Sequence, residues 1–469
     1  MRRSRVVPIL FPLILLAVVL AAPGWATAVL AQDASPDAPA EEGAYLPGRL
    51  IVGLDPDAAL PEAAALQAAD ALAALDAQVI VADDPCVVTG TLAAGAVSAP
   101  TAVQSWQVLP GREEEAIALL SQQPGVRFVV RDVPMFAAQD EVVEPAGADA
   151  AASAAAETAY PVDDPLYTSR QWGPQRANFA RAWQMLLVSS TLTAITVTVI
   201  DSGVDFNHPE LAGRLLPGKN YLDPDATAND ENGHGTHVSG IIAALINNGQ
   251  GIAGSAPQVL IDPRKVLNAE GSGSAFNLRY ALCDAALDGA RVVNMSLQIS
   301  RSYVENPSSG LYRALKEAVD FAEARGVLLV AAGGNNRFTH EVYYPALFEE
   351  VVAVAALTVD NKRPDYGPIG SKVEIAAPGG DAAAPVLSTW PAAASVRQKC
   401  GAPVQSGSGW YCGEYGTSMA SPYVAGGAAL LLSLRPTLTA PQVRAILRET
   451  ATDVGLDATE QGAGGLLAL

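Results

Sequence analysis

The sequence predicts an α/β fold, a doubly wound and mostly parallel sheet, preceded by a small α+β module of ferredoxin-like topology. Three observations support this prediction. From about Tyr160 onward, strand patterns alternate with helical patterns, as in parallel sheets with helices on both faces. Between residues 45 and 137, strand and helix patterns follow the order β-α-β-β-α-β. Between these parts, residues 138–160 are largely alanine with scattered acids, which is typical of an exposed linker.

The start of the chain predicts export. Three arginines lie within the first five residues, an apolar stretch covers residues 6–22, and small residues offer cleavage after Ala28 or Ala31. This is the pattern of a secretory signal peptide, so we expect a secreted, extracellular protein with a signal at residues 1–31 and an acidic spacer at residues 32–44. An uncleaved membrane anchor is the alternative, although prolines interrupt the apolar stretch. No later segment is expected to be apolar enough to span a membrane.

The two folded parts have distinct element patterns. In the front module, residues 45–137, we expect strands at 48–54, 78–82, 103–109 and 126–131, and helices at 61–75 and 112–122. The second domain, residues 161–469, carries the alternating pattern, and almost no chain remains after it to form a further part.

Composition and charge exclude several classes of protein. The 469 residues are 50% hydrophobic and 17% charged, which excludes a long disordered chain. The formal net charge is −20, which argues against a nucleic-acid partner because phosphate binding needs a basic face. Four cysteines in a chain of 469 residues exclude a small disulfide-rich scaffold. Residues 32–160 alone hold 20 acids and 4 bases, so the second domain is only mildly acidic.

Two polar motifs follow a predicted strand or open a predicted helix. The strand in AITVTVIDSGVD (residues 194–205) ends on Asp201, at the edge where open α/β sheets place their sites, although an aspartate that only caps a loop is the alternative. In NGHGTHVSGII (residues 232–242), His234 opens an apolar helix that continues through Ile246. A metal site with His237 is disfavoured because the HEXXH spacing is absent, and a purely structural histidine is the other alternative.

The third motif is GTSMASPYVAG (residues 416–426). Ser418 begins a helix that is apolar nearly all round, so this helix is expected to be buried. Pro422 is expected within the first turn, where a missing N–H costs little. A helix N-terminus directs free N–H groups and positive charge at a reacting serine, which suits a nucleophile whose attack creates an oxyanion. The esterase pattern GxSxG is not matched, because Ala420 occupies its last position.

The three residues occur in the order Asp, His, Ser, which is the order of subtilisin. Residues from Asp164 to about Leu466 resemble the subtilisin-like serine proteases, most closely their thermitase-like branch, through DSGVD, HGTHVSG and GTSMASP. The resemblance implies a serine endopeptidase in which Ser418 is the nucleophile, His234 the general base and then acid, and Asp201 the residue that orients the imidazole. It implies no cofactor for the chemistry.

The resemblance also implies groups around this triad. Asn335, after a strand at residues 326–331, matches the amide that binds the oxyanion together with the backbone N–H of Ser418. Two chain edges would hold an extended polypeptide substrate between them. The residues expected there are Gly271, Ser272, Gly273, Ser296, Leu297, Gln298 and Gly333. Gln298 stands where the family usually has glycine, so its side chain would narrow or polarise the wall of the S1–S4 substrate pockets. The preferred P1 residue therefore stays open.

Structural Ca²⁺ is the metal that the resemblance implies. The ligands of a first site would be Asp164, Glu210, Leu245, Asn248, Gln250 and Ile252, with Glu210 standing where aspartate is usual. Carboxylate, amide and carbonyl oxygens suit this ion. A second site would use Asp223, Asp225 and Thr227, with Asn220 replacing an expected acid. A solvated acidic turn is the alternative for both sites.

The front module resembles the inhibitor-type propeptide of the same family. It is expected to cap the active-site cleft as an intramolecular inhibitor, and to help a slowly folding parallel sheet to form. The enzyme would cut its own linker at a bond between about Phe136 and Pro161. Cys400 and Cys412 would form a disulfide in an exported protein. Cys283 is expected to be a buried thiol, and the remaining cysteine, Cys86, to leave with the propeptide.

Two other functions stay open at this point. A catalytically silent binding module on the same fold is disfavoured because the three triad residues and Asn335 are all present. A carboxylic-ester hydrolase is disfavoured because GxSxG is absent. We therefore expect a monomeric, secreted endopeptidase that is made as a zymogen, acts on polypeptides, and binds neither nucleic acid nor, after removal of the signal, a membrane.

Overall fold

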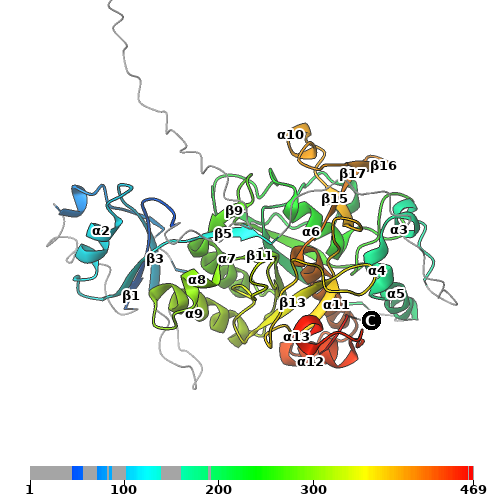
Figure 1. Cartoon of the computed structure of the whole chain (residues 1–469). Helices are drawn as coiled ribbons and strands as arrows, with labels where there is room; N and C mark the ends of the chain where they lie inside the picture. Colours follow the sequence, from blue (N-terminus) through cyan, green and yellow to red (C-terminus); the bar gives the residue numbers. More distant parts are fainter. Residues whose placement is uncertain are drawn as a thin grey trace, which may run out of the picture. The chain divides into compact units, whose positions relative to one another are not determined.

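Figure 1 shows the computed structural model of the chain. It describes residues 45–55, 71–81, 84–86, 102–138, 160–188, 192–462 and 464–467. The predicted signal peptide and spacer, most of the helix predicted at residues 61–75, and nearly all of the linker lie outside these residues. All described residues belong to one compact unit, Pro36–Leu469.

The front module contains a four-stranded antiparallel sheet in the order β2-β3-β1-β4. Its elements are β1 (Arg49–Leu54), β2 (Gln78–Val81), β3 (Ala102–Gln107), α2 (Glu113–Leu120) and β4 (Val126–Arg131). Side chains alternate along β1, so Leu50 and Val52 pack into the module's own core with Leu120. Ile51, on the opposite face, belongs to a core that it shares with the second domain. The predicted strands and the second predicted helix are confirmed, with ends that differ by at most two residues.

The second domain is built on a seven-stranded sheet in the order β14-β13-β12-β10-β6-β8-β7, in which every described strand pair is parallel. The strands are β6 (Thr196–Asp201), β7 (Lys219–Asn220), β8 (Leu260–Lys265), β10 (Val292–Met295), β12 (Leu328–Ala332), β13 (Val351–Leu357) and β14 (Ile375–Pro378).

Helices cover both faces of this sheet. The helices that do so are α6 (His234–Ala243) and α11 (Thr417–Leu434) on one face, and α7 (Ala275–Leu287) and α9 (Gly310–Ala324) on the other. Along β12, Leu328 and Val330 join the core under α6 and α11, whereas Leu329 and Ala331 join the core under α7 and α9. Helix α11 packs across β13, β12 and β10 (Figure 1). The predicted doubly wound fold is therefore confirmed.

Shorter elements surround the sheet. Two further sheets are β11-β5-β9, from β5 (Pro134–Ala137), β9 (Ser272–Ser274) and β11 (Leu297–Gln298), and β15-β17-β16, from β15 (Val386–Trp390), β16 (Val404–Ser406) and β17 (Gly409–Glu414). Other helices in the described part of the chain are α3 (Pro165–Ser169), α4 (Trp172–Arg176), α5 (Phe179–Val188), η1 (Pro209–Leu211), α8 (Arg301–Val304), α10 (Ala394–Arg397), α12 (Ala440–Thr450) and α13 (Ala458–Gln461).

Two helices differ from expectation. Helix α6 ends at Ala243 rather than Ile246, because Ala244 is extended and the amide of Leu245 donates to the carbonyl of Glu210 instead of continuing the helix. Helix α11 is 18 residues long and apolar enough to cross a membrane by length and composition, although 89% of it is buried in the fold. The expectation that no segment after the predicted signal peptide would be apolar enough to span a membrane was therefore wrong.

The cysteines form two disulfides. The predicted Cys400–Cys412 bond is present. Cys86 is bonded to Cys283 of α7, with 5.1 Å between their Cα atoms and a sequence separation of 197. The expectation of a free thiol at Cys283 was therefore wrong, and Cys86 is covalently joined to the second domain in the uncut chain. Only the packing of the module against α7 brings these two residues together.

Candidate active site

Asp201 and His234 come from adjacent elements of the second domain. Asp201 is the last residue of β6, and His234 is the first residue of α6. Their side chains are fully buried, and Oδ1 of Asp201 lies 2.8 Å from Nδ1 of His234. The amide of Ser202 also donates to this oxygen at 2.7 Å, which fixes the carboxylate. The imidazole is thereby oriented with Nε2, its other nitrogen, left for a reacting group.

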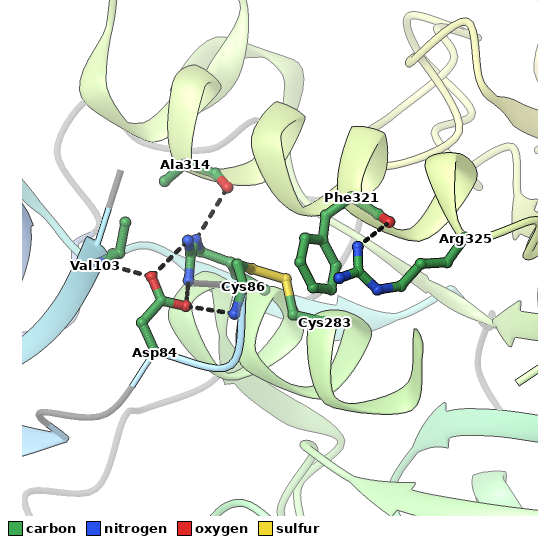
Figure 2. The surroundings of a disulfide bond; sticks show 8 residues. Asp84, Cys86, Val103, Cys283, Ala314, Phe321 and Arg325 are labelled. Atoms are coloured by element: carbon green, nitrogen blue, oxygen red, sulfur yellow. Dashed lines mark hydrogen bonds and ion pairs between the residues drawn. A yellow bond between two sulfur atoms is a disulfide. The ribbon is translucent and has the colours of Figure 1, made fainter. Parts of the chain in front are cut away.

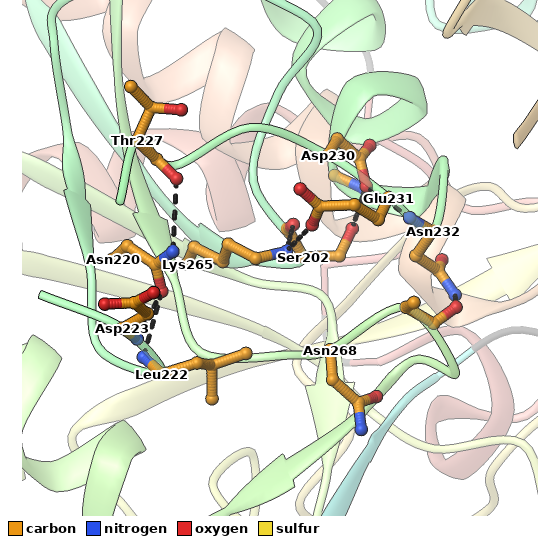
Figure 3. A network of polar contacts seen from close by, with 12 residues as sticks. Ser202, Asn220, Leu222, Asp223, Thr227, Asp230, Glu231, Asn232, Lys265 and Asn268 are labelled. Atoms are coloured by element: carbon orange, nitrogen blue, oxygen red, sulfur yellow. Dashed lines mark hydrogen bonds and ion pairs between the residues drawn. The ribbon is translucent and has the colours of Figure 1, made fainter. Parts of the chain in front are cut away.

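A second buried aspartate holds the turn before His234. Asp230 accepts hydrogen bonds from the hydroxyl of Ser202 and the amide of Asn232, at 2.9 and 3.0 Å (Figure 3). It also accepts from the amides of Gly233 and Thr236, at 2.8 and 2.9 Å. Sequence reasoning did not assign this residue. An aspartate just before a helix start is nevertheless a capping signal that identifies such a role.

The charges around His234 shift its pKa. Burial alone would lower the pKa, but the carboxylates of Asp201, Glu414 and Asp230 outweigh burial and raise it. Glu414, the last residue of β17, is 1% exposed, and neither carboxylate oxygen has a hydrogen-bond partner among the described residues. Burial raises the pKa of Glu414 to about 7. Sequence reasoning missed this acid, because nothing in its local pattern indicates that it is buried.

Ser418 lies in the first turn of α11, where the backbone N–H groups are free to bind a ligand. Its hydroxyl donates to the carbonyl of Ser296 at 3.0 Å. Pro422 lies inside the helix, not within its first turn as expected, so it cannot donate to the carbonyl of Ser418 four residues earlier. The hydroxyl of Ser296 donates to that carbonyl at 2.8 Å instead.

Two donors converge on the carbonyl oxygen of Ala138. The amide of Ser418 donates to it at 3.1 Å and Nδ2 of Asn335 at 2.6 Å. The side chain of Asn335 is held in place because its Oδ1 accepts from the amide and the hydroxyl of Thr417, at 2.9 and 2.8 Å. The neighbouring Asn336 instead donates to Tyr343 at 2.7 Å within its own loop. These two donors form what we call the oxyanion pocket.

The chain before Ala138 lies between the two edges expected to bind substrate. Strand β5 pairs antiparallel with β9 on one side and with β11 on the other, so Phe136 is opposite both Ser272 and Gln298. The amide of Ala137 donates to the carbonyl of Gly271 at 3.0 Å, and that of Ala138 to the carbonyl of Ser296 at 3.2 Å. An extended backbone is therefore bound on both edges.

The other residues expected at these edges have distinct positions. The backbone of Gly273 pairs with Met135, and that of Leu297 with Ala137. Oε1 of Gln298 accepts from the amide of Asn335 at 3.2 Å, so its side chain reaches the loop that carries the oxyanion donor. Gly333 instead pairs with the backbones of Val354 and Tyr343 inside the second domain.

The residues expected at the first calcium site lie together. Asp164 and Glu210 are 1% and 0% exposed, and burial raises both pKa values, that of Glu210 to about 7. Asp164 accepts from the amides of Asn247 and Asn248 at 2.9 and 3.1 Å. Glu210 accepts from Nδ2 of Asn248 at 3.0 Å and from the hydroxyl of Tyr411 at 2.7 Å. No described basic side chain forms an ion pair with these two buried carboxylates, and carboxylate oxygens of this kind suit a calcium ion.

The second calcium site is assembled less completely. Nδ2 of Asn220 donates to the carbonyl of Thr227 at 3.1 Å, so that an amide nitrogen rather than an oxygen faces this carbonyl (Figure 3). Asp223 and Asp225 are exposed. Calcium binding by these residues stays a prediction.

Comparison with known proteins agrees with this geometry. Residues 193–464, more than half of the chain, match the model of the subtilase family. Thermitase of Thermoactinomyces vulgaris is 37% identical over 295 residues, which are 63% of this chain and 93% of thermitase. Subtilisin DY of Bacillus licheniformis is 38% identical over 264 residues, which are 56% of this chain and 85% of subtilisin DY.

A solved structure resembles a larger part of the chain. The crystal structure of fervidolysin from Fervidobacterium pennivorans, described as a keratinolytic enzyme related to subtilisin, matches with a TM-score of 0.70 and 25% identity. The match covers 91% of this chain and 61% of fervidolysin. The family match and the relatives, together with the buried Asp-His pair and the serine at the start of α11, lead to one conclusion: the chain belongs to the subtilase family of serine endopeptidases.

Proposed function

We propose that this chain is a secreted serine endopeptidase, made as a zymogen, that cuts its own backbone between Ala138 and Gln139 and then cleaves other polypeptides. One observation carries the proposal: the carbonyl of Ala138 accepts from both donors of the oxyanion pocket while β5 is held between β9 and β11. A peptide bond in that position is the bond a serine protease attacks.

The residues present account for each step. Oγ of Ser418 attacks the carbonyl carbon of Ala138 while Nε2 of His234 takes its proton, and the oxyanion is stabilised by the oxyanion pocket. The bond to Gln139 then breaks, and His234 returns the proton to the leaving amine. Water hydrolyses the resulting ester by the reverse use of the same groups. Because Ser418 donates to Ser296 in the structure and Nε2 of His234 has no partner among the described residues, Ser418 changes rotamer before attack.

The bound segment also supports a substrate class. Ala138 occupies the P1 position and is fully buried, and Met135, at P4, is fully buried as well. Backbone pairing on two edges tolerates many sequences, whereas the buried side chains select. We therefore propose extended polypeptides with a small P1 residue and an apolar P4 residue as substrates.

The front module acts as an inhibitor for the same reason. While β5 fills the space between β9 and β11, no other polypeptide can pair with these edges. We use the term prosegment for the part of the chain that ends at Ala138. A structural calcium ion, held by Asp164, Glu210, Asn248 and the main-chain carbonyls of Leu245, Gln250 and Ile252, would stabilise the second domain without taking part in the chemistry.

The self-cleavage is tested by comparing the wild type with Ser418→Ala. The wild type is expected to yield a fragment whose first residue is Gln139, found by N-terminal sequencing of the denatured and reduced protein, and Ser418→Ala is expected to stay uncut. Ser371→Ala, at an exposed serine, is the matched control and should process normally. Processing of purified Ser418→Ala, or a wild-type cut elsewhere in the linker, would contradict the proposal.

A further inference from the structure

We propose that the prosegment stays covalently joined to the second domain after the cut at Ala138, as the inhibitory chain of a two-chain protein held by the Cys86–Cys283 disulfide. Its release would then require a thiol reductant in addition to cleavage. This inference rests on the proposed self-cleavage but concerns a different bond and a different surface.

The disulfide spans the bond that is cut. Cys86 precedes Ala138 in the chain and Cys283 follows it, in α7 of the second domain. Hydrolysis of the Ala138–Gln139 bond therefore leaves two polypeptides that are still linked through sulfur. No described cysteine is free, so neither half of this bond has another described thiol with which to exchange.

A buried ion pair beside the disulfide positions the two partners. The guanidinium of Arg279, one turn before Cys283 on α7, donates to both carboxylate oxygens of Asp84 at 2.6 and 2.8 Å. These side chains are 1% and 2% exposed. The carboxylate also accepts from the amides of Cys86 and Val103, at 2.9 and 2.6 Å (Figure 2). Asp84 therefore fixes both β3 and the segment that carries Cys86 against α7.

The surface around this pair is a packed core. Ile51, Val103 and Phe128 of the front sheet belong to one buried cluster with residues of α7 and α9. Gly310, the first residue of α9, leaves the space that the Phe128 ring fills. Hydrolysis at Ala138 removes none of these contacts, so they position the cleaved prosegment while the disulfide prevents its dissociation.

The tether changes the strength of the inhibition. A free cleaved prosegment is diluted into the solvent, whereas a linked one stays near its site at an effective concentration of about millimolar. Strand β5 therefore rebinds between β9 and β11 faster than a competing substrate at ordinary concentration can enter. The cut enzyme is expected to be latent, although its triad is complete.

Reduction supplies the release. A dithiol attacks the Cys86–Cys283 bond, forms a mixed disulfide, and then closes its own disulfide, so that two electrons pass from the dithiol and both cysteines become thiols. Both cysteines are fully buried, so the interface must open before the dithiol reaches the sulfur atoms. Loss of the bond makes the prosegment an ordinary dissociable inhibitor.

The experiment compares the full-length wild type, expressed in an oxidising compartment, with the double variant Cys86→Ser/Cys283→Ser. Cys400→Ser/Cys412→Ser, which removes the other disulfide, is the matched control. Intact mass without reductant, intact mass with dithiothreitol, and turnover of a chromogenic peptide are measured for each. For the wild type we expect a single mass, the sum of both fragments, that separates into two on reduction, with at least a tenfold rise in turnover.

The variants separate the possible outcomes. The Cys86→Ser/Cys283→Ser protein is expected to lose its prosegment on gel filtration without reductant and to be active at once, whereas the control variant keeps the prosegment. Separation of wild-type fragments without reductant would overturn the tether. If the chain stays uncut, the proposed self-cleavage fails, and an added endopeptidase that cuts the linker then tests the tether by the same masses. If the double variant does not fold, alkylation of the denatured, unreduced wild type decides, since a free thiol at Cys86 or Cys283 contradicts the proposal.

Discussion

The hydroxyl of Ser296 donates to the main-chain carbonyl of Ser418 at 2.8 Å and so replaces the hydrogen bond that Pro422 cannot make. The main-chain carbonyl of the proposed nucleophile is therefore held by a residue next to β11, the edge that pairs with β5. This hydrogen bond fixes the start of α11 next to β11 and holds the amide of Ser418 where it donates to the carbonyl of Ala138.

Ser296→Ala is expected to lower the free energy of unfolding by about 1–3 kcal/mol, because it leaves a buried carbonyl without a donor. The double variant Ser296→Ala/Pro422→Ala should recover part of this loss, since alanine restores an N–H at position 422. Denaturant unfolding in the Ser418→Ala background, which prevents self-digestion, measures both. Strictly additive losses in the double-mutant cycle would show that the two residues do not share this role.

Asn335→Ala is expected to fold and to lower kcat by about 10²–10³, or about 3–4 kcal/mol of transition-state stabilisation, because one of two oxyanion donors is removed. Asn336→Ala, at the adjacent residue, is the control and should leave kcat near the wild-type value while weakening the loop that Tyr343 holds. Steady-state kinetics on a peptide substrate decide. Near-normal turnover by Asn335→Ala would remove this residue from the mechanism.

Glu414→Gln is expected to change how stability depends on pH. The folded protein keeps Glu414 protonated up to about pH 7, against an ordinary pKa of 4.5. Its contribution to stability is therefore complete below about pH 4.5 and is lost as pH rises through 7, which amounts to at most about 3 kcal/mol. Glutamine cannot ionise, so the stability of the variant relative to the wild type should rise between pH 5 and pH 8. Thermal unfolding in the Ser418→Ala background at both pH values measures this, and the exposed Glu349→Gln is the control.

The same substitution tests the electrostatics of the triad. The charge of Glu414 helps to raise the pKa of His234, so its removal should move the acidic limb of the kcat/KM profile to lower pH. An unchanged acidic limb would mean that Glu414 does not act on His234.

Removal of calcium is expected to lower Tm. A ligand present at 100 times its Kd adds about 2.7 kcal/mol to folding stability, and a chelator removes this contribution. Asp164→Asn/Glu210→Gln should lose the calcium-dependent part of Tm, whereas Asp223→Asn/Asp225→Asn should keep most of it. Calorimetry with and without a chelator separates the two sites, and a wild-type Tm that is indifferent to calcium would argue against both.

Gln298→Gly is expected to widen the choice of P1 residue. The side chain of Gln298 reaches the amide of Asn335 beside the buried Ala138, so its removal should raise kcat/KM for bulky P1 residues relative to alanine. Gln298→Met keeps the length but not the hydrogen bond, and separates volume from polarity. A peptide library read by mass spectrometry measures the preference. The explanation is wrong if the glycine variant keeps the wild-type ranking.

The local sequence was sufficient for the features that depend on short-range pattern. The alternation of strands and helices predicted the doubly wound sheet, and residues at strand or helix ends, Asp201, His234 and Ser418, were found because each carries its own motif. The resemblance then gave Asn335 a role that fits the observed hydrogen bond to Ala138. Asp230 carried a capping signal that was not used.

Other features depend on residues that are far apart in sequence. Nothing near Glu414 indicates its burial, and nothing near Pro422 indicates that Ser296 donates in its place. The sequence limits the candidate scissile bond only to the region between about Phe136 and Pro161. The position of β5 between β9 and β11 is what points to Ala138.

The sequence by itself determined the fold class and pointed to the three residues proposed as the triad, because hydrophobic periodicity and motif spacing are properties of neighbouring residues. The tertiary structure decided which carbonyl enters the oxyanion pocket and which cysteine joins Cys86. Those pairings are made by the packing of the front sheet against α7 and α9, and a contact across 197 residues leaves no local signal.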